Sequence, residues 1–230
     1  MINYDEFLRR LEEVRSRITA ACERVGRDPR EIQLLAVTKG HPIDAVKYVS
    51  RATLPLVGES RVQEAVKKMD LADFTIRWEL VGHLQTNKAK VAAERFDRIQ
   101  SVDRERLIHA LDRHAGSFGK ELPIFLQVNA GDDPAKFGVS VEEAPKLLET
   151  ALNAKNLRID GLMTIAPFDE TREAARRAFA RLRELRDELE EKFTVSLPGL
   201  SMGMSGDLVE AIEEGSTLIR IGTALFGARD

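Results

Sequence analysis

Eight short apolar runs, each followed by a stretch with helical periodicity, constrain the fold of this chain more than any other feature. The runs lie at 32–38, 54–58, 76–82, 97–102, 122–129, 157–165, 197–203 and 217–222. The helical stretches lie at 43–52, 60–70, 86–94, 103–115, 140–154, 169–193 and 205–214. Strands that alternate with helices pair in parallel, with each helix as the crossover. Eight such units predict a closed α/β barrel of the (β/α)8 TIM type. An open doubly wound sheet is the alternative.

A single domain over residues 1–230 is expected, with one extra helix before the first strand. Within 4–26, apolar residues such as Phe7, Leu11 and Val14 recur at helical spacing, which predicts an amphipathic helix. No linker, low-complexity tract or internal repeat divides the chain. Barrels of this class commonly form one unit of about 200–250 residues.

Composition and charge exclude several classes of function. A content of 43% hydrophobic residues is typical of a globular chain rather than a disordered one. The 35 basic and 38 acidic residues nearly balance, so the charge does not favour nucleic acid or an anionic membrane as a partner. The single cysteine excludes a disulfide framework within the chain, and the four histidines show no metal-ligand spacing. No metal site is expected.

The location expected for this chain is the cytoplasm. Its first residues lack the pattern of a signal peptide, in which a positively charged segment precedes an apolar run. No stretch of about 18 consecutive apolar residues occurs that would span a membrane.

The last two strand ends carry the strongest signal for a ligand. Phosphate commonly binds after strands 7 and 8 of such barrels. Ser205 is expected to cap the helix 205–214, whose free backbone N–H groups would bind an anion. Gly222 and Thr223 add a further N–H and a hydroxyl group. Together these residues predict a phosphate cup, although each alone is compatible with a simple cap or turn.

Lys39 follows the first run, which is apolar almost throughout, so its amine is expected at the mouth of the barrel. Desolvation there lowers the pKa of a lysine, and a neutral amine forms a Schiff base with an aldehyde. The alternative is a surface lysine whose amine simply extends into water.

Arg220 lies within the apolar run 217–222, next to the predicted phosphate cup. A buried guanidinium needs hydrogen-bond acceptors. They would come either from a neighbouring acid, as a structural salt bridge, or from a ligand through its ring nitrogen or phosphate.

The motifs at these positions resemble one family closely. LLAVTK, VGESRVQEA, ELVGHLQTNK, GLMTIAP, LSMGMSGDLVEAIEEGST and IRIGTALFG occur in the order found in the pyridoxal phosphate homeostasis proteins, from about residue 32 to residue 227. The resemblance implies a barrel of fold type III, similar to the N-terminal domain of alanine racemase without its second domain.

The resemblance also implies a cofactor and its binding residues. Pyridoxal 5′-phosphate would be held as a Schiff base on Lys39, with Arg220 facing the pyridine nitrogen and the phosphate on Ser205, Gly222 and Thr223. Ser60 and Met202 complete the candidate cofactor-binding residues; no catalytic residue is assigned. At two positions the chain departs from the family pattern: Ser60 replaces an asparagine and Glu79 replaces a histidine.

The function implied is that of a binding protein for vitamin B6 homeostasis. It would buffer pyridoxal phosphate and deliver it transiently to apo-enzymes, as a monomer or a dimer and without catalytic turnover. The alternative is an amino acid racemase of the alanine racemase type, which needs an acid–base group on each face of the substrate carbon. A Schiff-base aldolase ranks third, because Met163 lies where such an enzyme carries its lysine.

Overall fold

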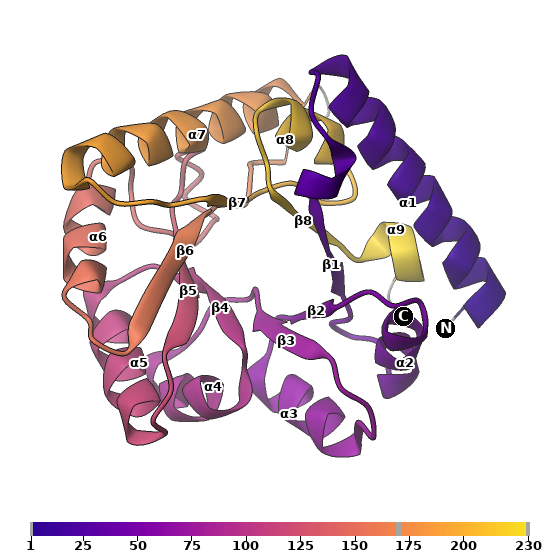
Figure 1. The fold of residues 1–230 in the computed structure, drawn as a ribbon, viewed down its shortest axis with the longest axis horizontal. Helices are drawn as coiled ribbons and strands as arrows, with labels where there is room; N and C mark the ends of the chain where they lie inside the picture. The colour runs from indigo at the N-terminus through magenta and orange to yellow at the C-terminus, as the bar shows by residue number, and fades with distance from the viewer. Residues whose placement is uncertain (1, 169–171, 229–230) are drawn as a thin grey trace.

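The computed structural model describes residues 2–168 and 172–228, and its strands form a closed parallel barrel in chain order (Figure 1). The strands are β1 (Gln33–Val37), β2 (Leu56–Glu59), β3 (Arg77–Leu80), β4 (Arg98–Val102), β5 (Leu122–Gln127), β6 (Leu157–Met163), β7 (Gly199–Ser201) and β8 (Leu218–Ile221). The barrel closes where β1 pairs with β8, with Leu35 beside Arg220. The predicted barrel is therefore confirmed, and an open sheet is excluded.

Helices surround the strands on the outside of this ring (Figure 1). They are α1 (Tyr4–Arg24), α2 (Ile43–Arg51), α3 (Val62–Leu71), α4 (Ala89–Arg95), α5 (Glu105–Ser117), α6 (Ala144–Leu152), α7 (Glu173–Phe193), α8 (Leu208–Glu213) and α9 (Thr223–Phe226), with 3₁₀ turns at Pro29–Glu31 and Thr86–Lys88. The helix predicted at 169–193 begins at Glu173, and residues 169–171 lie outside the described part. The short α9 was not predicted.

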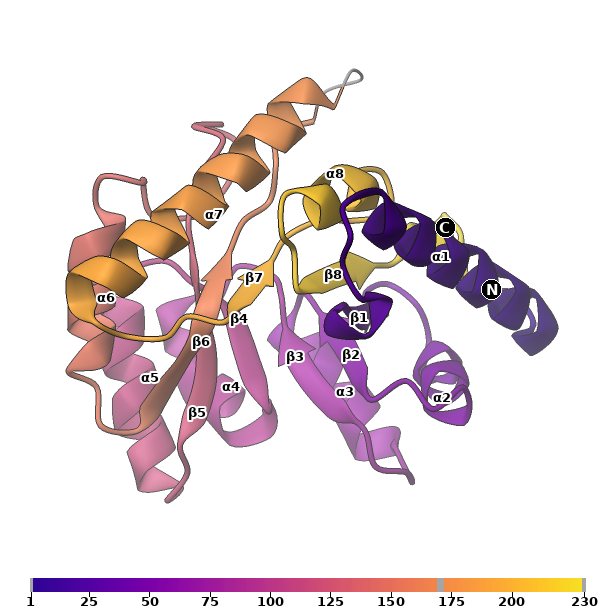
Figure 2. The same cartoon turned by 45° about the horizontal axis from the view of Figure 1, so that its top comes forward.

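The expected N-terminal helix is present as α1. The side chain of Asn3 caps it by accepting a hydrogen bond from the backbone N–H of Glu6. It ends at Arg24, two residues before Gly26, which has a φ of 68° and so takes the left-handed conformation typical of a helix end. Helix α1 packs against α8 and α9, the two helices that follow the last strands (Figures 1 and 2).

The interior of the barrel has its own side chains, separate from the main core. Leu34 and Ala36 belong to the large apolar cluster between strands and helices. Leu35 and Val37 belong to a small second cluster, and because side chains alternate along a strand, this cluster faces the barrel interior. Its other members are Leu56, Val81 and Leu218.

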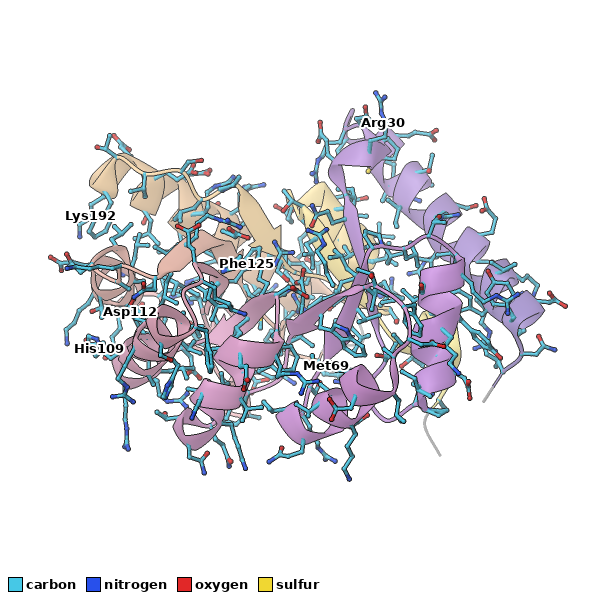
Figure 3. All side chains as sticks on the ribbon, turned by 60° about the horizontal axis from the view of Figure 1, so that its bottom comes forward. Arg30, Met69, His109, Asp112, Phe125 and Lys192 are labelled. Carbon is cyan, nitrogen blue, oxygen red and sulfur yellow. The ribbon has the colours of Figure 1, made fainter. Side chains whose placement is uncertain are left out.

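The other half of the interior is polar. Glu79, Arg98, Gln100 and Ser201 are linked there by hydrogen bonds. The guanidinium of Arg98 lies 5.0 Å from the ring centroid of Phe125, which Figure 3 labels within the fold. Apolar layers usually fill such barrels, so this polar half is a departure from the usual interior.

Candidate functional site

A cavity of about 630 Å³ opens at the carboxyl ends of the strands. Its walls come from segments that follow most of the eight strands. The lining residues include Val37, Lys39, Ser60, Val81, Gly82, His83, Gln127, Lys136, Phe137, Ile165, Ala166, Met204, Ser205, Gly206, Asp207, Arg220, Gly222 and Thr223. Active sites of these barrels form at this end, which makes the cavity the candidate site.

Six of the seven predicted cofactor-binding residues line this one cavity. They come from separate loops and strand ends: Lys39, Ser60, Ser205, Arg220, Gly222 and Thr223. The sequence placed them at strand ends, and closure of the barrel brings those ends together. The structure therefore gathers the predicted lysine, arginine and hydroxyl groups around one space.

Met202 is the exception, because it does not line the cavity. Its side chain is fully buried in the main apolar core. Its backbone N–H donates to the Leu218 carbonyl and its own carbonyl accepts from the Ser216 hydroxyl. The methionine of this segment that lines the cavity is Met204.

Ser205 does not cap the following helix, so that prediction was wrong. Helix α8 begins at Leu208 with Asp207 as its N-cap residue, and the Asp207 carboxylate accepts the N–H of Met204. The hydroxyl of Ser205 instead accepts the N–H of Ala224, at 3.1 Å. The turn over residues 205–207 separates Ser205 from the start of α8, and its side chain reaches α9 instead.

The loop that holds Ser205 is fixed from outside the barrel as well. Both terminal nitrogens of Arg17, on α1, donate to the Ser205 carbonyl at 3.2 Å. On the facing segment, Gly222 runs close to β1, where an added Cβ would lie 3.2 Å from the Val37 carbonyl oxygen. The two predicted phosphate-binding segments are thus held side by side.

Arg220 is 5% exposed and makes no ion pair within the described ranges 2–168 and 172–228. Its Nη1 donates to the carbonyl and the hydroxyl of Ser201, both at 2.7 Å, and its Nη2 donates to the Thr164 carbonyl at 2.7 Å. Burial lowers the pKa of Arg220 to about 10, against the opposing charge of Asp207. The salt bridge considered from the sequence does not form among these residues, and neutral acceptors fix a cation at the cavity wall.

A buried ionic cluster fixes the backbone on both sides of Lys39. The amine of Lys68 donates to the Thr38 carbonyl at 2.8 Å, to Glu59 at 2.6 Å and to Glu64 at 2.9 Å. Glu64 also accepts the N–H of Gly40 at 2.6 Å. Burial raises the pKa of the Glu59 carboxyl, although Lys68 and the Thr38 hydroxyl oppose the shift. This cluster was not predicted, because its only local signal in the sequence is the i, i+4 spacing of Glu64 and Lys68.

The mouth of the cavity carries aromatic and apolar side chains that the sequence did not single out. The rings of His83 and Phe137 stack with centroids 3.9 Å apart. The Gln127 side chain holds this loop by donating to the Phe137 carbonyl at 2.9 Å. Phe168 and Met204 are also exposed at the cavity. An apolar rim therefore surrounds a polar floor.

The charge of the lining suits an anionic ligand. Among the described lining residues, Lys39, Lys136, Arg172 and Arg220 are basic, and Asp207 is acidic. The described residues hold no cluster of three or more His, Cys, Asp or Glu that could bind a metal ion. Within the same part of the chain, no helix has the length and apolar character needed to cross a membrane.

Comparison with known sequences identifies close relatives over nearly the whole chain. The family described as alanine racemase, N-terminal domain, matches residues 10–230. The pyridoxal phosphate homeostasis protein of Aquifex aeolicus is 42% identical over 96% of this chain and 97% of its own length. That of Pseudomonas aeruginosa is 42% identical over 96% of this chain and 94% of its own length.

Solved structures agree with the fold. PipY of Synechococcus elongatus, determined with pyridoxal phosphate bound, has a TM-score of 0.83 and 37% identity, covering 96% of this chain and all of PipY. An alanine racemase of Clostridium difficile has a TM-score of 0.80 at 12% identity, over 97% of this chain and 57% of that one, which shows a shared fold only. The chain belongs to the pyridoxal phosphate homeostasis proteins, within the family of alanine racemase N-terminal domains.

Proposed function

We propose that this chain binds pyridoxal 5′-phosphate in the barrel-mouth cavity and links its aldehyde to the amine of Lys39. The observation that carries the proposal is that Lys39, Arg220 and the Ser205 and Thr223 hydroxyls line one cavity of about 630 Å³. An amine can form a Schiff base with an aldehyde, two hydroxyl groups can donate hydrogen bonds to a phosphate, and a guanidinium can donate to a ring nitrogen. The relatives named for pyridoxal phosphate homeostasis support the same ligand.

The Ser205 and Thr223 side chains and the backbone at Gly222 would hold the phosphate. These groups are neutral donors on two segments that the Ser205–Ala224 hydrogen bond joins. The basic side chains around the cavity add a favourable potential for the anion without a direct contact. Phosphate binding by hydroxyls and backbone N–H groups at a short helix is common in these barrels.

Arg220 would face the ring nitrogen of the bound cofactor. A guanidinium donates hydrogen bonds and carries a positive charge, so it stabilises the unprotonated ring nitrogen. Pyridoxal phosphate supplies a reactive aldehyde and, when its ring nitrogen is protonated, a strong electron sink. An arginine at this place favours holding the cofactor over using that sink.

The role that follows is storage and delivery without catalytic turnover. The protein would limit the free level of a reactive aldehyde and release it to apo-enzymes in transient encounters, as a cytoplasmic monomer. A racemase would need a second acid–base group opposite Lys39. Tyr4 and Tyr48 are the tyrosines of the chain, and they pack against each other with ring centroids 5.3 Å apart, away from the cavity lining.

Titration with pyridoxal phosphate tests this proposal. The wild-type protein should develop the visible absorbance of a lysine-bound cofactor. Lys39→Ala should lose that absorbance and retain weaker, non-covalent binding through the phosphate. Lys136→Ala is the matched control, because Lys136 lines the same cavity and its loss should leave the absorbance unchanged. Covalent binding that survives Lys39→Ala would overturn the assignment.

A further inference from the structure

A line of hydrogen-bonded side chains runs through the barrel interior from Arg220 to Glu79. Nη1 of Arg220 donates to the Ser201 hydroxyl at 2.7 Å, and this hydroxyl donates to Oε1 of Gln100 at 2.6 Å. Nε2 of Gln100 then donates to the Glu79 carboxylate. The exposed fraction of each of the four residues is 5% or less, so water does not compete with these bonds.

Glu79 and Arg220, at the two ends of this line, determine which group donates and which accepts in every hydrogen bond between them. An ionised carboxylate only accepts, so Gln100 must present its NH2 group to Glu79. Its Oε1 therefore faces Ser201, which must donate its proton to it. Arg220 only donates, so the Ser201 oxygen accepts from it. The Ser201 hydroxyl thus has one orientation, although a serine hydroxyl otherwise rotates freely.

Glu79 is in turn held from the other side. Its second oxygen accepts from Nη2 of Arg98 at 2.6 Å, and Nη1 of Arg98 donates to Asp160 at 3.1 Å. Arg98 therefore places a positive charge directly against the Glu79 carboxylate in the interior. Buried polar networks of this kind add little stability compared with apolar packing, and the opposite half of the interior is apolar. A need for stability alone does not account for the line.

We propose that Glu79 and Gln100 are positioning residues, which hold the Arg220 guanidinium in place for the ring nitrogen of the ligand. Arg220 has no acid to hold it among the described residues, and its acceptors are two backbone carbonyls and the Ser201 hydroxyl. Only the hydroxyl can turn away, and Gln100 and Glu79 prevent it from turning. This inference rests on the proposed binding of pyridoxal phosphate.

Substituting Glu79→Gln reverses the donor and acceptor direction of the hydrogen bonds along the line, while the side chain at position 79 keeps its size and shape. The new amide at position 79 must offer its oxygen to Arg98, so its NH2 group faces Gln100. Gln100 must then turn over and present its own NH2 group to Ser201. The Ser201 oxygen would accept from both Gln100 and Arg220, and its proton would lose its buried acceptor. The hydrogen bond to Arg220 should weaken.

Exchanging the two side chains restores the original direction. In the double variant Glu79→Gln, Gln100→Glu, the carboxylate at position 100 accepts from Ser201, and the amide at position 79 donates to it while accepting from Arg98. The double variant holds the same atoms as the wild type in total. A role that acts through the direction of the line therefore predicts rescue by the second substitution.

The measurement is the affinity for two probes, pyridoxal phosphate and its 1-deaza analogue, which has a C–H group in place of the ring nitrogen. Glu79→Gln should weaken binding of pyridoxal phosphate about tenfold, the effect of one hydrogen bond to a charged group. It should shift the visible absorbance of the bound cofactor. Binding of the deaza analogue should be unchanged, and the double variant should regain the wild-type absorbance and affinity.

Two further variants separate positioning from folding. Asp160→Asn changes the far side of Arg98, beyond Glu79, and should leave both affinities unchanged. Ser201→Ala removes the hydroxyl that connects Arg220 to Gln100 and keeps the backbone carbonyl to which Arg220 donates. It replaces Glu79→Gln in the test if that variant does not fold.

The outcomes distinguish this inference from the proposed function. Equal weakening of both probes, no weakening by Glu79→Gln, or no rescue by the exchange would overturn the positioning role while leaving the cofactor assignment intact. Failure of the wild-type protein to bind pyridoxal phosphate would overturn both. Selective weakening followed by rescue is the result expected.

Discussion

The hydroxyl of Ser205 accepts the backbone N–H of Ala224 at 3.1 Å, across 19 residues of sequence. This bond ties the loop after β7 to the first turn of α9. The loop that holds Ser205 and the segment that holds Gly222 and Thr223, which were predicted as two parts of a phosphate site, are therefore joined by a hydrogen bond. Because α1 also anchors this loop through Arg17, the N-terminal helix takes part in shaping the site.

Removing either hydroxyl from this unit should weaken retention of pyridoxal phosphate. Ser205→Ala and Thr223→Ala should each cost about 1–3 kcal/mol of binding free energy, since each removes a hydrogen bond to a charged phosphate. Equilibrium titration measures the loss. Pyridoxal, which lacks the phosphate, serves as the control ligand, and its affinity should not change. Full retention of pyridoxal phosphate by both variants would contradict the phosphate assignment.

Arg220→Ala should shift the absorbance of the bound cofactor and weaken its binding about tenfold to a hundredfold. The reason is the loss of the guanidinium next to the ring nitrogen. Arg172→Ala is the control, because Arg172 adds positive charge at the same cavity but is exposed. An unchanged spectrum and affinity would contradict contact with the ring nitrogen and would leave Arg220 a structural role, in which it donates to the Ser201 and Thr164 carbonyls.

Glu59 makes the stability of the protein depend on pH. Burial raises the pKa of Glu59 above its ordinary value of 4.5. The folded state therefore favours the protonated carboxyl, and this contribution is full below pH 4.5 and is lost as the pH rises through the folded-state pKa. Glu59→Gln cannot ionise. The free energy of unfolding of this variant, measured in urea, should rise relative to wild type as the pH increases above 4.5, by about 1.4 kcal/mol for each unit of the pKa shift. A difference that does not vary with pH would contradict this.

Two glycines of the cavity lining should differ in their tolerance of an added methyl group. A Cβ at Gly82 would lie 2.2 Å from the Ser60 carbonyl oxygen, so Gly82→Ala must displace the backbone at Ser60. A Cβ at Gly206 would have no atom within 4 Å. We expect Gly82→Ala to lower both thermal stability and affinity for pyridoxal phosphate. Gly206→Ala should be tolerated in folding, and equal stability of the two variants would contradict the close approach.

The barrel and most of the candidate site could be predicted from the sequence because both depend on local patterns. Apolar runs mark strands, and the carboxyl end of each barrel strand lies at the mouth, so Lys39 and Arg220 could be assigned to the site from their places along the chain. The helix boundaries are less exact, as α8 shows by beginning at Leu208 rather than at 205. The four-residue α9 is too short to produce a periodic signal.

The partners of polar side chains could not be predicted. Ser205 and Asp207 are both good capping residues, and only the path of the loop decides that Asp207 occupies the cap. The pairing of Glu79 with Arg98 depends on which faces of β3 and β4 point inward. The motif of residues 201–206 contains two methionines, of which Met202 is buried in the main core and Met204 lines the cavity.

Borohydride reduction of the protein loaded with pyridoxal phosphate, followed by peptide mapping, tests the central claim most directly. We expect one modified peptide, with the cofactor fixed on Lys39, and no modified peptide from the Lys39→Ala variant. Fixation on Lys136 or another lysine, or no fixation at all, would contradict the assignment of Lys39 as the residue that holds the cofactor.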